Sequence, residues 1–330
     1  MAFMNIHRYL THYLQGMAVG LAEIIPGVSG STVALLLGIY DDFIDLLYQG
    51  TQLVKVGAQY AIGQKKWKDL KKQWQAIQFE FGILLGLGMV TSVLLFSSII
   101  VYLLFTFPHY TFAFLLGLTP PTMVIVYKQV KKMTMKNFLI AAGTAILFLS
   151  IFIFGGNSQA ITNPHPLHLF VGGMVAISAM VLPGVSGSFM LLVVGLYNFV
   201  IGLVASAKNG LTGQEMVSLG FLLSGIVVGL FTTSQVLKWA FEKIRSELMS
   251  FLLGLLAASW YVLWPFVTIT GIEHDEPVLG KVSPTFFPPI TTILIILIAL
   301  VTATSVYLMH RWADRQDTES PKADSGFDKL

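Results

Sequence analysis

Long apolar runs separated by short polar segments dominate this chain of 330 residues. A helix needs about 20 apolar residues to cross the hydrocarbon core of a bilayer, and six runs are of about this length or longer. They are Phe79–Phe105, Tyr110–Tyr127, Asn137–Phe154, Val217–Leu237, Leu248–Val267 and Pro289–Met309. The pattern therefore predicts an all-α polytopic membrane protein.

Two further apolar stretches, Leu14–Tyr48 and Phe170–Ala205, are interrupted in the middle by proline and glycine. The interruption is the same hexapeptide, Pro-Gly-Val-Ser-Gly-Ser, at Pro26–Ser31 and Pro183–Ser188. Because proline and glycine disrupt helices, we expect each stretch to consist of two shorter helices with a break between them.

The two hexapeptides belong to a longer internal duplication. They start 157 positions apart, and the match extends on both sides at that offset. Matched residues include Gly16, Met17, Gly38 and Tyr40 with Gly173, Met174, Gly195 and Tyr197. A second shared block, Phe-Leu-Leu-Gly-Leu, lies at Phe114–Leu118 and Phe251–Leu255, at an offset of 137. Internal repeats of this kind are typical of membrane transporters.

The distribution of lysine and arginine predicts the topology, because short loops rich in these residues stay cytoplasmic. The basic segments are 51–78, 128–136, 238–245 and the C-terminal tail, whereas 155–168 and 268–287 carry few cations. The assignment is consistent only if each interrupted stretch enters and leaves on one side as a re-entrant hairpin. We therefore expect both termini in the cytoplasm.

Three spans follow each hairpin, and this odd number predicts an inverted-topology repeat. Repeat 1 covers 1–155, with a re-entrant hairpin at 10–50, a basic cytoplasmic segment at 51–78 and three transmembrane helices at 79–155. Repeat 2 covers 156–310, with a hairpin at 169–206 and three transmembrane helices at 216–310. Residues 311–330 form a polar cytoplasmic tail that we expect to be disordered.

Hairpins that enter from opposite faces would bring the two hexapeptides together near the bilayer midplane. The proline would stop one half-helix, a serine would cap the next, and free backbone amides at that helix start would bind an anion such as phosphate. The candidate substrate-binding residues are Pro26, Gly27, Ser29, Gly30, Ser31, Thr32, Pro183, Gly184, Ser186, Gly187 and Ser188. The alternative is that these small residues serve only close helix packing.

Glu23 is the ionisable residue nearest the first hexapeptide, in a segment expected to reach the midplane. A charged carboxylate at that depth costs about 2.5–3.5 kcal/mol on insertion scales, which favours its neutral form. We hypothesise that Glu23 carries a coupling proton, with the alternative that a neutral Glu23 braces the hairpin by hydrogen bonds. Its counterpart in the second half is Met180.

The remaining charges have simpler interpretations. Asp41, Asp42 and Asp45 follow the first hairpin, where charge at a membrane exit is common, and Arg245 is expected to pair with its neighbours Glu242 and Glu247. The segment Lys55–Lys72 also contains Trp67, and Trp74 follows it. It reads either as a basic interfacial helix on anionic lipids or as a solvated loop.

Composition supports a membrane protein and narrows its chemistry. Hydrophobic residues make up 55% of the chain and charged residues 11%, with a mean hydropathy of +0.74, which excludes an ordinary soluble globule. The chain has no cysteine, so disulfides and thiolate sites are excluded. The seven histidines have no metal-ligand spacing. We expect no metal, no cofactor, no nucleic-acid partner and no removable signal peptide.

The sequence Glu-x-x-Pro-Gly-Val-Ser-Gly-Ser-Thr, within Glu23–Tyr40, resembles the bacterial DUF368 membrane proteins. The resemblance covers nearly the whole chain short of the tail. It implies a transporter, not an enzyme, that returns undecaprenyl phosphate from the outer to the inner leaflet of the bacterial cytoplasmic (inner) membrane, for cell-wall and polysaccharide synthesis. It also implies phosphate binding at the two hexapeptides. Gly30-Ser31-Thr32 stands where the family pattern has Gly-Gly-Thr, a small departure.

Two other functions remain open from the residues alone. Undecaprenyl-pyrophosphate phosphatases are similar in having inverted repeats with Pro-Gly-x-Ser loops, but they place an arginine beside the serine, where this chain has Gly30 and Gly187. A transporter of small soluble anions would use the same helix ends for a compact substrate.

Overall fold

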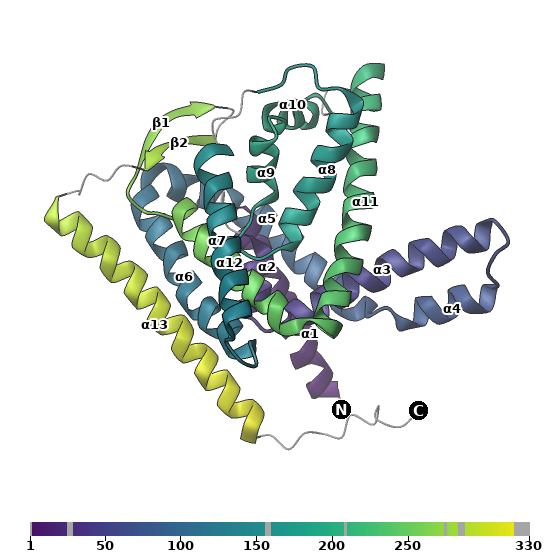
Figure 1. The fold of residues 1–330 in the computed structure, drawn as a ribbon, viewed down its shortest axis with the longest axis horizontal. Coiled ribbons are helices and arrows are strands. Elements are labelled where there is room, and N and C mark those ends of the chain that lie inside the picture. Colours follow the sequence, from purple (N-terminus) through teal and green to yellow (C-terminus); the bar gives the residue numbers. More distant parts are fainter. Residues whose placement is uncertain are drawn as a thin grey trace.

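The computed structural model describes residues 2–24, 29–155, 160–207, 210–273, 276–282 and 288–319. Within these ranges the chain is almost entirely helical (Figure 1). The first half contains α1 (Ala2–Glu23), α2 (Gly30–Leu36), α3 (Tyr40–Ala61), α4 (Trp67–Ala76), α5 (Phe79–Thr106), α6 (Pro108–Gln129) and α7 (Met135–Gly155). The second contains α8 (Pro166–Val181), α9 (Gly187–Val193), α10 (Tyr197–Ala207), α11 (Gly213–Lys243), α12 (Arg245–Val262), β1 (Val267–Glu273), β2 (Glu276–Val282) and α13 (Pro289–Glu319).

Five described helices are long and apolar enough to cross a membrane, namely α5, α6, α7, α11 and α13. They fall on five of the six runs that the sequence predicts. The sixth run corresponds to α12, an 18-residue helix that packs against α6 and α7. The prediction of an all-α polytopic membrane protein is therefore confirmed.

Two local predictions were wrong. Helix α12 ends at Val262, and Val267 instead begins β1, which pairs antiparallel with β2 from Val267 opposite Val282 to Glu273 opposite Glu276. Backbone pairing in this loop has no sequence signal as clear as an apolar run. At the other end of α13, the helix continues to Glu319, so the tail begins as helix, not as a disordered segment. Residues 320–330 lie outside the described part.

Each half opens with the same helix, break, short helix and turn. The turns after α2 and α9 contain Gly38 and Gly195, with φ of 73° and 74°, a backbone conformation that glycine adopts without strain. The backbone N–H of Ile39 donates to the Ala34 carbonyl and that of Leu196 to the Leu191 carbonyl, both at about the same length, 2.9 and 2.8 Å. The hexapeptide repeat thus produces the same local structure twice.

Glycines set equivalent helix contacts in both halves. A methyl group added to Gly16 of α1 would lie 2.1 Å from the carbonyl oxygen of Leu85 in α5. In the second half, a methyl group on Gly173 of α8 would lie 2.4 Å from the carbonyl oxygen of Leu222 in α11. These residues correspond at offsets of 157 and 137. Small residues allow such close backbone approach between membrane helices.

The last helix of each half also packs against the middle membrane helix of the other half. Helix α6 packs on α13, and α12 packs on α7. A methyl group on Gly117 of α6 would lie 2.5 Å from the Ala299 carbonyl oxygen, and one on Gly254 of α12 would lie 2.3 Å from the Ala141 carbonyl oxygen. The two sequence repeats are therefore structural repeats that interlock through α6, α7, α12 and α13.

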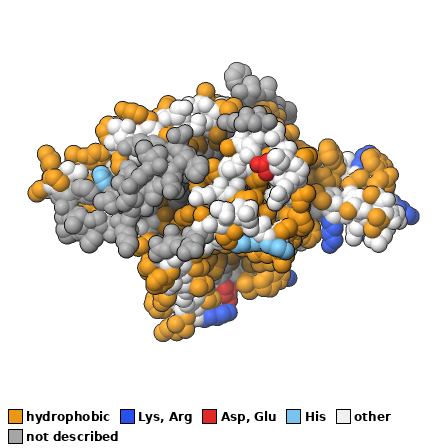
Figure 2. Space-filling view, turned by 90° about the horizontal axis from the view of Figure 1, so that it is seen from above, with side chains coloured by type: hydrophobic (Ala, Val, Ile, Leu, Met, Phe, Trp, Pro, Cys, Tyr) orange, Lys and Arg blue, Asp and Glu red, His pale blue; other side chains and the backbone are white. Residues whose placement is uncertain are grey.

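Helices α3 and α4 pack together as an arm that projects from the helical body (Figure 1). Helix α3 reaches Ala61, so it continues well beyond the expected end of the hairpin at residue 50. In the space-filling view of Figure 2 the arm is the lobe at the right, where hydrophobic and basic side chains lie side by side.

Candidate functional site

The two interruptions of the helices meet inside the protein. The described part of the first is Ser29–Thr32, and that of the second includes Pro183–Ser188. Pro26 and Gly27 lie outside the described residues. Ser29, Ser31 and Thr32 are all buried, with at most 7% of the residue surface exposed, so these polar residues are enclosed by protein and must find partners there.

Hydrogen bonds join the first half of the chain to the second around the two interruptions. The backbone N–H of Gly184 donates to Thr32 Oγ1 at 2.8 Å. Ser29 Oγ donates to the Met180 carbonyl at 3.3 Å, and the hydroxyl of buried Tyr40 donates to the Val181 carbonyl at 3.0 Å. The last carbonyls of a helix have no partner within it, so residues of the first half satisfy the end of α8 in the second.

Glu23 holds the start of α2. Its Oε1 accepts a hydrogen bond of 2.8 Å from the backbone N–H of Gly30. A methyl group on Gly30 would lie 2.5 Å from this oxygen, so an alanine at this position would displace the Glu23 carboxylate. The expectation that Ser29 or Ser31 caps this helix was wrong for Ser29, which occupies the cap position without a capping hydrogen bond and is paired with the Ser31 hydroxyl instead.

The serines of the second hexapeptide are more exposed than those of the first. Pro183 and Gly184 are buried, and Gly184 has a φ of 86° that suits glycine. Gly187 begins α9, and the hydroxyls of Ser186 and Ser188 hydrogen-bond each other at 2.8 Å. Ser186 is half-buried and Ser188 is exposed, unlike the buried Ser29 and Ser31. The equivalent serines thus differ in access.

Two cavities adjoin the junction. The smaller, of about 20 Å³, has room for about one water molecule. Its polar lining combines both halves and consists of Ser29, Thr32, Thr119, Thr122, Gly184 and Ser259. The larger, of about 150 Å³, is mostly apolar and contains Glu23, Gly30 and Ser31 on its wall. Among the described residues that line the two cavities, none is a lysine or arginine.

Sequence reasoning missed the hydroxyls of α6 and α12. Thr122 and Ser259 are buried, and each donates to a carbonyl of its own helix, those of Leu118 and Leu256, at 2.8 Å. Thr119 similarly donates to the Leu116 carbonyl at 2.8 Å. Pro120 has no N–H, so it cannot donate the helical hydrogen bond that this carbonyl would otherwise accept. The offset of 137 that relates Thr122 to Ser259 was the available signal.

The polar donors of the two interruptions already have partners within the protein. As it stands, the amides of Gly30 and Gly184 and the hydroxyl of Ser29 are engaged by protein partners. Ser29 and Gly184 line the smaller cavity, whereas Gly30 lines the larger one. Among the described residues, no group of histidines and carboxylates is arranged to hold a metal ion.

Comparisons with known proteins identify the family of the chain. A family model described as VCA0040-like, undecaprenyl phosphate translocase-like, matches residues 19–277. A polyprenyl-phosphate transporter of Vibrio cholerae serotype O1 is 30% identical, covering 93% of this chain and 98% of that protein. A polyprenyl-phosphate transporter of Staphylococcus aureus is 27% identical, covering 76% of this chain and 85% of that protein.

No solved structure matches the chain significantly. The family match includes both hexapeptides, and the resemblance to DUF368 proteins is confirmed. The chain is a multi-pass membrane protein and belongs to the VCA0040-like (DUF368) family of membrane transport proteins.

Proposed function

We propose that this protein is a flippase that moves undecaprenyl phosphate across the bacterial cytoplasmic membrane, from the outer to the inner leaflet. The phosphate binds where the two interrupted hairpins meet. The polyprenyl tail remains in the lipid, because only the charged headgroup faces a high cost in hydrocarbon. The recycled carrier then serves cell-wall and polysaccharide synthesis.

One observation carries the proposal. Two identical polar motifs lie 157 positions apart in the sequence, and Thr32, directly after the first motif, accepts a hydrogen bond of 2.8 Å from the backbone N–H of Gly184 in the second. Non-helical backbone at membrane depth is tolerated where it is buried in protein or lines a cavity, and discontinuous helices at a repeat interface form the substrate sites of many transporters. The names of the two relatives supply the class of lipid.

The repeats support an inverted topology. Helix α1 rises from the N-terminus in the view of Figure 1, whereas its counterpart α8 descends from the opposite end of the molecule. With the basic segments in the cytoplasm, the first hairpin enters from the cytoplasm and the second from outside. Each repeat then offers its serines to one leaflet.

Glu23 couples phosphate to protons in this proposal. Its carboxylate accepts a hydrogen bond of 2.8 Å from the backbone N–H of Gly30. An incoming phosphate would use the same N–H donor. Two anions cannot share this place without strong repulsion. Phosphate binding therefore favours a protonated Glu23, and the substrate and one proton bind together.

The cavities bear on the two competing functions. A phosphatase needs positive charge at the transition state, and the lining of the two cavities, as far as the structure describes it, contains no lysine or arginine. A transporter of small soluble anions needs a polar vestibule, whereas the cavity beside Glu23 is bordered mainly by apolar residues such as Phe43, Leu47 and Met89. Both observations favour a lipid substrate that undergoes no reaction.

The arm formed by α3 and α4 supports a contact with anionic lipids at the cytoplasmic face. Trp67 and Trp74 are 63% and 56% exposed, and Lys68, Lys71 and Lys72 are exposed on the same short helix. Tryptophan and lysine together favour the interface of an anionic bilayer.

The direct test is leaflet-resolved transfer of a labelled undecaprenyl phosphate in proteoliposomes. We expect the protein to accelerate loss of the label from the outer leaflet, and a pH gradient to change the rate. Unchanged transfer relative to protein-free vesicles would refute the function, and release of inorganic phosphate from undecaprenyl pyrophosphate would establish the phosphatase in its place.

A further inference from the structure

Ion pairs between the two halves gather at one end of the helices. Lys238 Nζ of α11 lies 2.7 Å from Asp45 Oδ1 of α3. One guanidinium nitrogen of Arg245, at the start of α12, lies 2.8 Å from Asp41 Oδ2, also of α3. All four side chains are partly exposed, between 26% and 51%. The first turns of α3 are thus held to the second half by charge.

The sequence expectation for Arg245 was wrong about its partners. Glu242 instead lies 3.5 Å from Lys238, and Glu247 lies 2.8 Å from Lys136. Arg245 reaches Asp41 because the chain brings α3 next to α11 and α12, which no local pattern indicates. The guanidinium also donates to Gln129 Oε1 at 2.9 Å.

A short chain of contacts joins these ion pairs to the candidate site. Arg245 lies over the ring of Phe241, 5.3 Å from its centroid. The Phe241 ring contacts Tyr40, with centroids 5.8 Å apart, and Tyr40 donates to the Val181 carbonyl beside the second interruption. Because Tyr40 directly precedes Asp41, movement of this turn would alter the site and the ion pairs together.

The opposite end has no equivalent charges. At the repeat offsets, Asp41 and Asp45 correspond to Asn198 and Gly202, and Lys238 and Arg245 correspond to Val101 and Pro108. The accessible serines, Ser186 and Ser188, belong to the half whose hairpin carries none of these carboxylates. Ion pairs therefore hold the two halves together at the charged end, whereas the serines of the second hexapeptide are more exposed.

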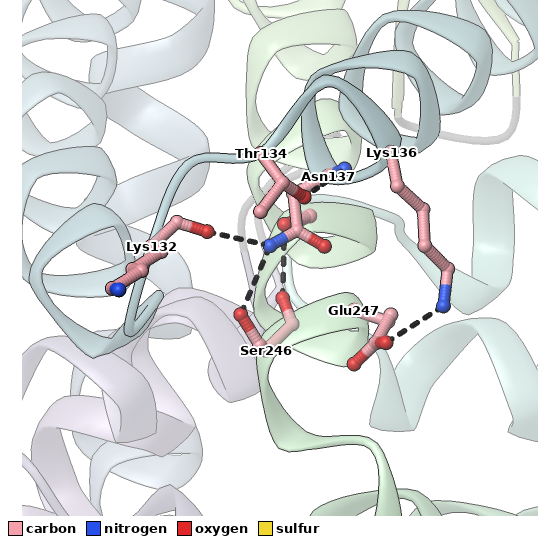
Figure 3. Close-up of polar contacts among 7 residues, drawn as sticks. Lys132, Thr134, Lys136, Asn137, Ser246 and Glu247 are labelled. Atoms are coloured by element: carbon pink, nitrogen blue, oxygen red, sulfur yellow. Dashed lines mark hydrogen bonds and ion pairs between the residues drawn. The ribbon is translucent and has the colours of Figure 1, made fainter.

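A second polar contact between the halves at the charged end joins α7 to α12 and does not involve α3 (Figure 3). Lys136 pairs with Glu247, and the buried amide of Asn137 donates to the Lys132 carbonyl at 2.8 Å and to Ser246 Oγ at 3.0 Å. This contact belongs to the extensive interface between α7 and α12. It provides a matched ion pair that joins the halves without holding the turn at Tyr40.

We propose that Asp41–Arg245 and Asp45–Lys238 form a charge gate at the cytoplasmic end, and that Lys238 and Arg245 form a second phosphate site there. While the gate is closed, Asp41 and Asp45 form ion pairs with these two cations. When α3 moves away, the freed ammonium and guanidinium groups receive the phosphate monoester of the lipid. Arginine and lysine are the usual protein partners of phosphate.

The gate resolves a difficulty of the midplane site, which binds phosphate with neutral donors only. A headgroup that leaves it must pass to a place that stabilises its charge before it reaches water. Lys238 and Arg245 provide that place, because they release the carboxylates of Asp45 and Asp41 and bind the phosphate instead. The phosphate-receiving role rests on the proposed function, whereas the gate itself does not.

Ser234 is a suitable reporter for opening. It is fully buried one turn before Lys238, and its Oγ lies 3.2 Å from Thr51 Oγ1 of α3. The chain has no cysteine, so Ser234→Cys introduces a single, nearly isosteric thiol. Its reaction with a membrane-impermeant maleimide, added from the charged side, measures how often α3 separates from α11.

The carboxylate variant Asp41→Asn with Asp45→Asn should raise this labelling rate about ten-fold, because it removes two partly exposed ion pairs that hold α3 to the second half. The cation variant Lys238→Gln with Arg245→Gln should raise it equally, and Lys136→Gln should leave it unchanged. Labelling that stays at the wild-type rate in both gate variants would overturn the gate.

Transport separates the phosphate site from the gate. If Lys238 and Arg245 receive phosphate, the cation variant should transfer labelled undecaprenyl phosphate at least ten-fold more slowly than the carboxylate variant, although both open equally. Equal transfer rates would overturn the phosphate site and leave the gate standing. Absence of transfer by the wild-type protein would overturn the phosphate site with the proposed function, while the labelling result would still decide the gate.

Discussion

Replacement of Glu23 by glutamine tests the competition between carboxylate and phosphate at the start of α2. Glutamine keeps the length of the side chain and an oxygen that accepts from the Gly30 amide, which lies 2.8 Å from Glu23 Oε1. It removes only the negative charge and the proton that the carboxyl binds. The variant therefore isolates electrostatics from packing.

The hydrogen bond sets the size of the effect. A hydrogen bond to a charged group contributes about 1.5–3 kcal/mol and a neutral one about 0.5–1.5 kcal/mol. The variant thus weakens the internal competitor by about 1 kcal/mol, which corresponds to about five-fold tighter phosphate binding. Loss of the repulsion between the two anions adds to this gain. The gain should be present at alkaline pH, where wild-type Glu23 is charged, and absent at acidic pH.

Calorimetric titration of the purified protein with a short-chain polyprenyl phosphate measures this directly at several pH values. Wild-type affinity should fall as pH rises relative to Glu23→Gln, which controls for ionisation of the lipid itself. Glu80→Gln, on α5 and partly exposed, is the matched acidic control and should follow the wild type. Identical pH dependence of Glu23→Gln and wild type would refute the coupling role.

Three further predictions test the junction, the helix packing and the arm. Thr32→Val leaves the Gly184 amide without its acceptor and should destabilise the folded protein by about 1–3 kcal/mol in thermal unfolding, whereas Thr122→Val, which loses only a bond to its own helix, should cost less; equal losses would contradict the cross-repeat role. Gly225→Ala would place a methyl 2.0 Å from a carbonyl oxygen of α8 and should lower the yield of folded protein, while Gly220→Ala, with open space around it, should not. Trp74→Phe should reduce fluorescence quenching by anionic lipids brominated near the headgroup, and unchanged quenching would place the arm away from the membrane.

The helices were predictable because their signal is local. An apolar run of sufficient length specifies a membrane helix with little reference to the rest of the chain, and α5, α7 and α11 lie where such runs occur. The hexapeptides and their flanking residues repeat at a single offset of 157. This repetition predicted that equivalent structures would recur, as the turns at Gly38 and Gly195 show.

The partners of polar groups were not predictable, because they depend on the packing of distant segments. Glu23 was identified as unusual, but only the fold shows that its oxygen reaches Gly30 seven residues later. Arg245 has acidic neighbours in sequence, yet it pairs with Asp41 because α3 passes beside it. The equal motifs also gave no indication that Ser31 is buried while its counterpart Ser188 is exposed, since this difference depends on the segments that pack around each motif.

The location of the bound headgroup tests the central claim most directly. A polyprenyl phosphate analogue with a photoreactive group beside the phosphate can be cross-linked to the protein in proteoliposomes, and the adducts located by mass spectrometry. We predict adducts in both hexapeptide regions, within 29–32 and 183–188. Adducts confined to one half, or to lipid-facing positions of α5 and α13, would contradict a shared site between the two repeats.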